Sequence, residues 1–140
     1  MDVLIMDMGD GVKGESSLPG YKEKIELLTF VPEVGAQSTG RVSGSERTSG
    51  RAAHQGFTVT KYMDAASPVL QQALIEGKRF PQVSVVIGHQ ERGGIQELMH
   101  YKMSDVIVSN FSISGGAGEM QVETWTFNYD KITSDFHPRA

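Results

Sequence analysis

The stretch MQVETWTFNYDKI, residues 120–132, decides the fold class. Its large side chains, Trp125, Phe127 and Tyr129, alternate with threonine, asparagine and aspartate, so an extended chain has one aromatic and one polar face. This period of two predicts a β-strand over residues 120–132. An aromatic face can stack on nucleic-acid bases, but such platforms accompany a basic groove and this chain is acidic. We therefore assign the three aromatic side chains to the core.

The residues before this strand predict a β-meander. A glycine-rich turn at residues 114–118 follows a long predicted strand, residues 98–111, with a bulge near Ser104 and Asp105. Residues 91–94, Glu-Arg-Gly-Gly, predict a hairpin turn that follows a strand at residues 83–87.

Further upstream, one helix is predicted between two β-regions. Ser67 suits the N-cap, Pro68 suits the first helical position and Gly77 suits the C-terminal stop. So short a helix needs a sheet to pack against. The preceding stretch, residues 55–63, alternates apolar and polar side chains and predicts a strand.

The N-terminal third is less regular. Residues 3–8 predict a strand, whereas residues 21–31 fit either a helix or a strand, with Pro32 ending the element or placing it at a sheet edge. Residues 35–53 are rich in serine, glycine and threonine and cannot form a core of their own. Such a long loop in a small domain is usually functional or disordered.

Together these patterns predict an all-β chain with one short helix. We expect a single domain over residues 1–140, a compact β-barrel of two packed sheets with a flanking α-helix and a long loop at residues 35–53. The chain has no cysteine, which excludes disulfides, thiolate metal sites and a thiol nucleophile. Its net charge of −4 gives no general reason to bind nucleic acid, and no apolar run is long enough to span a membrane.

No motif predicts a catalytic, cofactor or metal site. Residues 9–14 match G-x-G-x-x-G, but no helix can follow before Pro19, so a turn is the better interpretation. The four histidines lack helical metal-site spacing, and there is no nucleophile elbow. Most acidic residues, Glu123 among them, are expected at turns or on solvated strand faces. We therefore predict neither an enzyme nor a cofactor.

Four stretches in a fixed order resemble the Hcp family of type VI secretion tube proteins: KGES at residues 13–16, FTVTKYMDAASP at 57–68, SGGAG at 114–118 and ETWTFNY at 123–129. The resemblance implies a compact β-barrel that assembles as hexameric rings, which stack into a tube. A contractile sheath would push this tube out of a bacterial cell with a spike protein at its tip and small effector proteins in its lumen. The protein would thus leave the bacterial cytoplasm by that apparatus, since no secretory signal is predicted: Asp7 interrupts the apolar run and no basic residue precedes it.

Two surfaces are candidates for such an assembly. Residues 35–53 are long enough to reach another subunit, with Arg41, Val42, Arg47 and Arg51 as candidate ring-stacking residues. If Leu28 and Phe30 face the core, Thr29 and Val31 point the other way and are candidates for the lumen wall.

Two other functions remain open from the sequence. A lipocalin-like barrel that binds a small ligand would need an apolar cavity inside a monomer. The aromatic side chains and the one short helix are better suited to filling a core of this size. A hydrolase or isomerase on a small barrel would need convergent polar groups in a pocket, which a sequence does not show.

Overall fold

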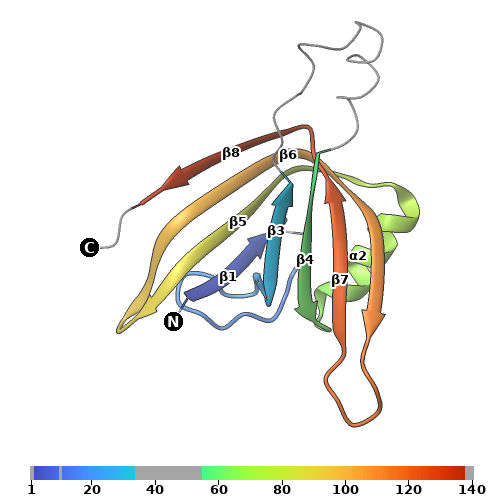
Figure 1. The fold of residues 1–140 in the computed structure, drawn as a ribbon, viewed down its shortest axis with the longest axis horizontal. Helices are drawn as coiled ribbons and strands as arrows, with labels where there is room; N and C mark the ends of the chain where they lie inside the picture. Colours follow the sequence, from blue (N-terminus) through green and yellow to red (C-terminus); the bar gives the residue numbers. More distant parts are fainter. Residues whose placement is uncertain (1, 10, 34–54, 138–140) are drawn as a thin grey trace, which may run out of the picture.

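The computed structural model describes residues 2–9, 11–33 and 55–137 and contains one antiparallel sheet and one helix within them (Figure 1). The strands are β1 Asp2–Asp7, β2 Ile25–Leu27, β3 Thr29–Glu33, β4 Gly56–Tyr62, β5 Arg79–Glu91, β6 Gly94–Ser114, β7 Val122–Asn128 and β8 Lys131–Phe136, and the helix is α2 Ala66–Glu76.

The sheet order is β2-β1-β5-β6-β7-β4-β3, with β8 also paired to β6. The all-β class with one flanking helix is confirmed. The strands form a single, strongly curved sheet where two packed sheets were predicted, and the sheet is not closed. Its two end strands, β2 and β3, are separated in the chain by Leu28 alone, so the curl brings the ends of the order near each other.

The long strand β6 explains why one sheet replaces two. It pairs with β5 along most of its length, while its other edge pairs first with β8, through Ser104, and then with β7, from Ile107 onward. Between these two residues Asp105 has a φ of 56°, a left-handed conformation that bends the strand. The predicted irregularity at Ser104–Asp105 is therefore present, but the shifts of register lie elsewhere, at Ile87/Gly88 and Val108/Asn110.

The same corner divides the last predicted strand. Residues 120–132 were expected as one strand, but β7 and β8 are separate because the chain turns at Tyr129 and Asp130. There the N–H of Tyr129 donates to Gln55 O and the N–H of Asp130 donates to Ser104 O. Both strands still run antiparallel along β6, one after the other.

The ambiguous stretch at residues 21–31 is two short strands. Tyr21 to Lys24 form a turn in which Glu23 has a φ of 64°, and the chain then enters β2 and β3. Pro32 lies in β3, which ends the sheet order, as expected for a residue without an N–H.

Helix α2 packs against β6 and ends where the sequence predicts. Gly77 has a φ of 66°, and the N–H of Lys78 donates to Ala73 O, which closes the C-terminus. The start was predicted wrongly, because Ser67 lies inside the first turn and Ala65 is the N-cap. Within the described residues, no helix is long and apolar enough to cross a membrane.

The aromatic side chains fill the interior of the curved sheet. Trp125, Phe127 and Tyr129 are buried, as predicted. Phe57 stacks on Phe127 with ring centroids 4.7 Å apart, and Phe111 stacks on Trp125 at 4.2 Å. Side chains therefore occupy the space that a ligand-binding barrel would leave open.

Candidate functional site

The outer surface of β3, β4, β7 and the second half of β6 is lined with hydroxyl groups. Residues opposite one another in a sheet share a face, so the register places together the outward side chains of these strands. We call this set the hydroxyl face: Thr29, Val31, Thr58, Thr60, Asn110, Ser112, Thr124 and Thr126. The Oγ1 atoms of Thr29 and Thr60 lie 2.6 Å apart, and those of Thr58 and Thr126 lie 3.5 Å apart.

None of these eight residues carries a charge. Glu33 shares their outward face, two residues beyond Val31 on β3, and is exposed, so one carboxylate lies at the end of the hydroxyl face. Apart from this end, the surface donates and accepts hydrogen bonds and offers no charge to a protein beside it.

Thr29 and Val31 are both exposed on this face, and Val31 keeps 55% of its surface accessible. Phe30 points inward, as the expectation required, and its ring lies 5.7 Å from that of Phe57. Leu28 does not face the core: it is 41% exposed, because the change from β2 to β3 occurs at this residue and interrupts the alternation.

The candidate stacking residues Arg41, Val42, Arg47 and Arg51 lie outside the described residues. The strands that flank this segment are described, and Glu33 pairs with Gly56 at one end of the β3–β4 ladder.

A charged network is buried behind the hydroxyl face. Lys61 on β4 is fully buried, and its Nζ lies 3.0 Å from Glu123 Oε1 on β7 and 2.7 Å from Asp64 Oδ1. The same ammonium donates to Ser67 Oγ at 3.1 Å and to Tyr62 O at 3.2 Å. One cation therefore joins two strands and the start of α2.

Glu123 Oε1 is the main acceptor of this network. It accepts hydrogen bonds from Ser67 Oγ at 2.8 Å and from Trp125 Nε1 at 2.9 Å, whereas Glu123 Oε2 is buried without a partner among the described residues. Asp64 Oδ1 accepts the N–H of Ala66, and Ser67 Oγ accepts the N–H of Asp64, so the same side chains also hold the backbone where the chain enters α2.

The expectation that Glu123 is solvated was wrong. Its position carried the signal, because Glu123 has the same parity in the alternation as Trp125 and Phe127. Lys61 likewise shares parity with Phe57 and Val59. A carboxylate and an ammonium at inward positions of two paired strands predict an ion pair in the core. Since the pair is sealed from solvent, it holds structure together and offers no access to a substrate.

The glycine-rich stretch at residues 9–14 makes a close contact between chain segments. The N–H of Gly14 donates to Glu23 O at 2.8 Å, and a Cβ on Gly14 would lie 2.6 Å from Lys24 O. The third glycine of the motif thus allows two backbone segments to approach, and no helix follows it.

Comparison with known proteins places this architecture. The family model described as "Type VI secretion system effector, Hcp" matches residues 6–136. The chain belongs to the Hcp family.

Two curated relatives come from Pseudomonas aeruginosa. "Protein hcp1" is 29% identical over 137 residues, which is 97% of this chain and 83% of the relative. "Major exported protein" is 28% identical over 130 residues, which is 86% of this chain and 73% of the relative.

Solved structures agree with the Hcp fold. "Structure of a type six secretion system protein" has a TM-score of 0.82 at 30% identity and covers 100% of this chain and 86% of its own. Hcp1 from Salmonella typhimurium has a TM-score of 0.78 at 24% identity, covering 98% and 86%, which supports the fold alone.

The residues that carry the Hcp resemblance meet in the buried network. The stretch at 57–68 supplies Lys61 and Ser67, and the stretch at 123–129 supplies Glu123 and Trp125. Two of the four stretches that carry the resemblance are thus one cluster in space, which ties the start of α2 to β4 and β7.

Proposed function

We propose that the protein is a tube subunit of a type VI secretion system. It would form hexameric rings that stack into an exported tube and carry small effector proteins in the lumen. The tube would leave the bacterial cytoplasm through the apparatus, with a spike protein at its tip and a contractile sheath around it. The family match over residues 6–136 carries this proposal, together with a structural neighbour that the whole chain superposes on.

The hydroxyl face is our candidate for the inner wall of the ring, with Thr29 and Val31 among its residues. A passage for different cargo proteins should hold none of them strongly by charge, and the eight residues of this face carry no charge, with Glu33 at its end. Cysteines at Thr29 and Val31 should cross-link to an enclosed effector. A failure to react with any co-purified effector would count against this face as the wall.

For ring stacking, we propose residues 35–53 with Arg41, Val42, Arg47 and Arg51. Supporting this, the neighbouring residues Glu33 and Gly56 lie at one end of the β3–β4 ladder.

Exposed apolar side chains occupy the other end of β4. They are Tyr62, Met63 and Met120, which lie together because the N–H of Met63 donates to Gln121 O. Two rings could then meet end to end, with residues 35–53 of one ring lying against the exposed apolar side chains at the end of β4 in the next. Deletion of residues 38–49 should abolish tubes and leave rings, and normal tubes would contradict the stacking role.

The lipocalin-like alternative has less support. Trp125, Phe57 and Phe127 are fully buried and fill the interior. An enzymatic function has no supporting constellation among the described residues either, because the clustered Lys61, Ser67 and Glu123 side chains are buried inside the fold.

The deciding measurement is molar mass by light scattering after size exclusion at several concentrations. The proposal predicts a species with roughly six times the 15.3 kDa mass of the chain, and ring-shaped particles in negative-stain micrographs. A monomer at all concentrations would contradict self-assembly of the rings.

A further inference from the structure

An apolar row runs out of the core toward the open edge of the sheet. The register aligns one residue from each of five neighbouring strands, so their side chains share the inner face of the sheet. The row is Leu27, Leu4, Ile87, Met99 and Phe136. Leu27 is buried, the next three are half-buried, and Phe136 is 65% exposed. The row thus ends in a large apolar side chain that the described part of the chain leaves uncovered.

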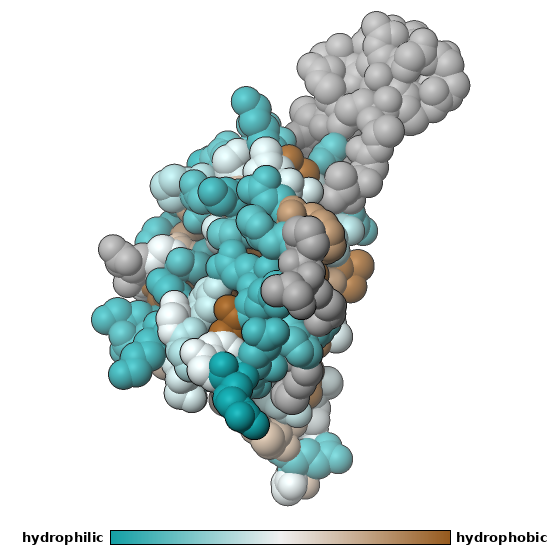
Figure 2. Space-filling view, turned by 90° about the vertical axis from the view of Figure 1, so that its left-hand side faces the viewer, coloured by the Kyte–Doolittle hydropathy of each residue, from teal (hydrophilic) through white to brown (hydrophobic). Residues whose placement is uncertain are grey.

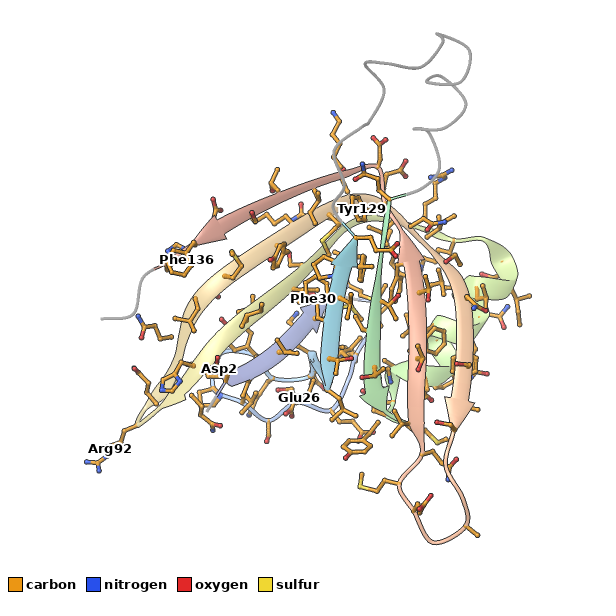
Figure 3. All side chains as sticks on the ribbon, viewed as in Figure 1. Asp2, Glu26, Phe30, Arg92, Tyr129 and Phe136 are labelled. Atoms are coloured by element: carbon orange, nitrogen blue, oxygen red, sulfur yellow. The ribbon has the colours of Figure 1, made fainter. Side chains whose placement is uncertain are left out.

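Strand β8, which carries Phe136, is an open edge. In the part of the chain that the structure describes it pairs with β6 only, and five of its six residues are exposed. Figure 3 shows Phe136 at the end of β8, far from the helix. The side of the molecule seen in Figure 2 is mainly hydrophilic with small separate apolar areas. A phenylalanine exposed on such an edge strand is therefore a distinct feature, of the kind that marks a contact with another chain.

A hollow of about 340 Å³ lies beside helix α2. Its lining is Pro68, Val69, Gln72, Ala73, Glu76 and Lys78. The Glu76 carboxylate already accepts a hydrogen bond from Gln72 at 2.7 Å. Gln72 is neutral, so Glu76 keeps its negative charge, and the rim carries this carboxylate and the ammonium of Lys78, whose Nζ lies 5.3 Å from the centroid of the Phe80 ring.

The two features lie at opposite ends of the longest axis of the molecule, as Figure 1 shows with β8 on the left and α2 on the right. A knob on one side and a hollow on the other make a heterologous contact, which generates a ring when the rotation between copies closes. Asp135 precedes Phe136 on the opposite face of this edge strand and makes no ion pair within the described residues. Its charge is opposite to that of Lys78 and the same as that of Glu76.

We propose that Phe136 of one copy inserts into the hollow beside α2 of the next copy in the ring, with Asp135 near Lys78. This contact rests on the proposed ring assembly and assigns the two surfaces that meet in it. The phenyl group of Phe136, at the end of the apolar row, would then be buried against a second copy and lose its contact with water.

Paired cysteines test the contact directly, because the chain has no cysteine of its own. The variant Phe136→Cys with Val69→Cys should form, on mild oxidation, a ladder of covalent oligomers that ends at the ring. The matched control is Phe136→Cys with Ile75→Cys, since Ile75 is 77% exposed on the same helix but does not line the hollow. The control should give no ladder beyond the dimer.

The outcomes separate this contact from the proposed function. A parent chain that forms hexamers while the Phe136/Val69 pair gives no ladder would overturn the contact and leave the tube subunit standing. A parent chain that remains a monomer would overturn the ring itself.

Charge reversal supplies a second test that does not depend on cysteines. Asp135→Lys and Lys78→Glu should each weaken ring formation by about tenfold, as single interface residues do, and the double variant should recover most of it. Additive losses in the double variant would contradict the pairing.

Discussion

Two ion pairs with the same separation differ in what surrounds them. Lys61 Nζ lies 3.0 Å from Glu123 Oε1, and Arg79 Nη1 lies 3.0 Å from Asp105 Oδ1. The first pair has no exposed side-chain surface, whereas the second has 65% and 50%. Removing one partner leaves a charge in the core in the first case and a solvated charge in the second. Burial therefore decides which of the two regions depends on its charges.

The largest effect is expected from Glu123→Ala. This change leaves Lys61 buried with one carboxylate fewer, and should lower the free energy of unfolding by about 3–5 kcal/mol, measured by urea denaturation. The matched variant Arg79→Ala removes the exposed pair without touching the left-handed Asp105, and should change it by about 1 kcal/mol or less. Equal losses for the two variants would contradict the role of burial.

A double variant sharpens the same comparison. Lys61→Met alone leaves the carboxylate of Glu123 without its ammonium, so it too should destabilise strongly. Lys61→Met with Glu123→Leu removes both charges, and the combined loss should be smaller than the sum by about 1–3 kcal/mol. Strict additivity in the double-mutant cycle would show that the two side chains do not act as a pair.

These two regions also show what the sequence predicts and what it leaves open. The alternation at residues 57–61 and 123–129 predicts strands, their buried faces and, by parity, the positions of Lys61 and Glu123. It does not predict that the two strands are neighbours, because pairing between distant strands depends on the whole topology. The ion pair could be found only by trusting the alternation over the usual preference of charged residues for solvent.

The bend in β6 was harder to foresee. The irregularity near Asp105 was predicted from the sequence. The change of neighbour along β6, from β8 to β7, was not, because it depends on a turn at Tyr129–Asp130 that has no glycine or proline. The hydroxyl face was predicted in part, from Thr29 and Val31, since its other members come from three more strands. The hollow beside α2 depends on packing and has no sequence signal.

The hydroxyl group of Tyr21 makes the stability of the fold depend on pH. Burial, followed by the hydrogen bond that its hydroxyl donates to Glu97 Oε2, raises the pKa of Tyr21 well above its ordinary value of 10.0. A raised pKa in the folded state means that the contribution is complete below pH 10 and is lost as the pH rises above it. The parent chain should lose stability above about pH 10.

Tyr21→Phe isolates this residue, because it removes the titrating hydroxyl but keeps the ring. The slope of stability against pH above about 10 should be shallower in the variant, measured by thermal unfolding across an alkaline series. Burial also raises the pKa of Tyr129, so part of the slope should remain. Identical slopes in the two proteins would mean that Tyr21 titrates no differently in the folded and unfolded chains.

The smallest effect is expected on the hydroxyl face. Thr29→Val keeps the shape of the side chain and removes the Oγ1 that lies 2.6 Å from Thr60 Oγ1. Because both groups are solvent-accessible, water replaces the lost hydrogen bond, and the free energy of unfolding should change by about 0.5 kcal/mol or less. The matched change Thr58→Val affects the longer Thr58–Thr126 contact and should be equally small. A loss above about 2 kcal/mol would show that these threonines stabilise the monomer. The stability of the monomer would then explain why threonines occupy these positions, and the argument that the hydroxyl face lines a lumen would lose its support.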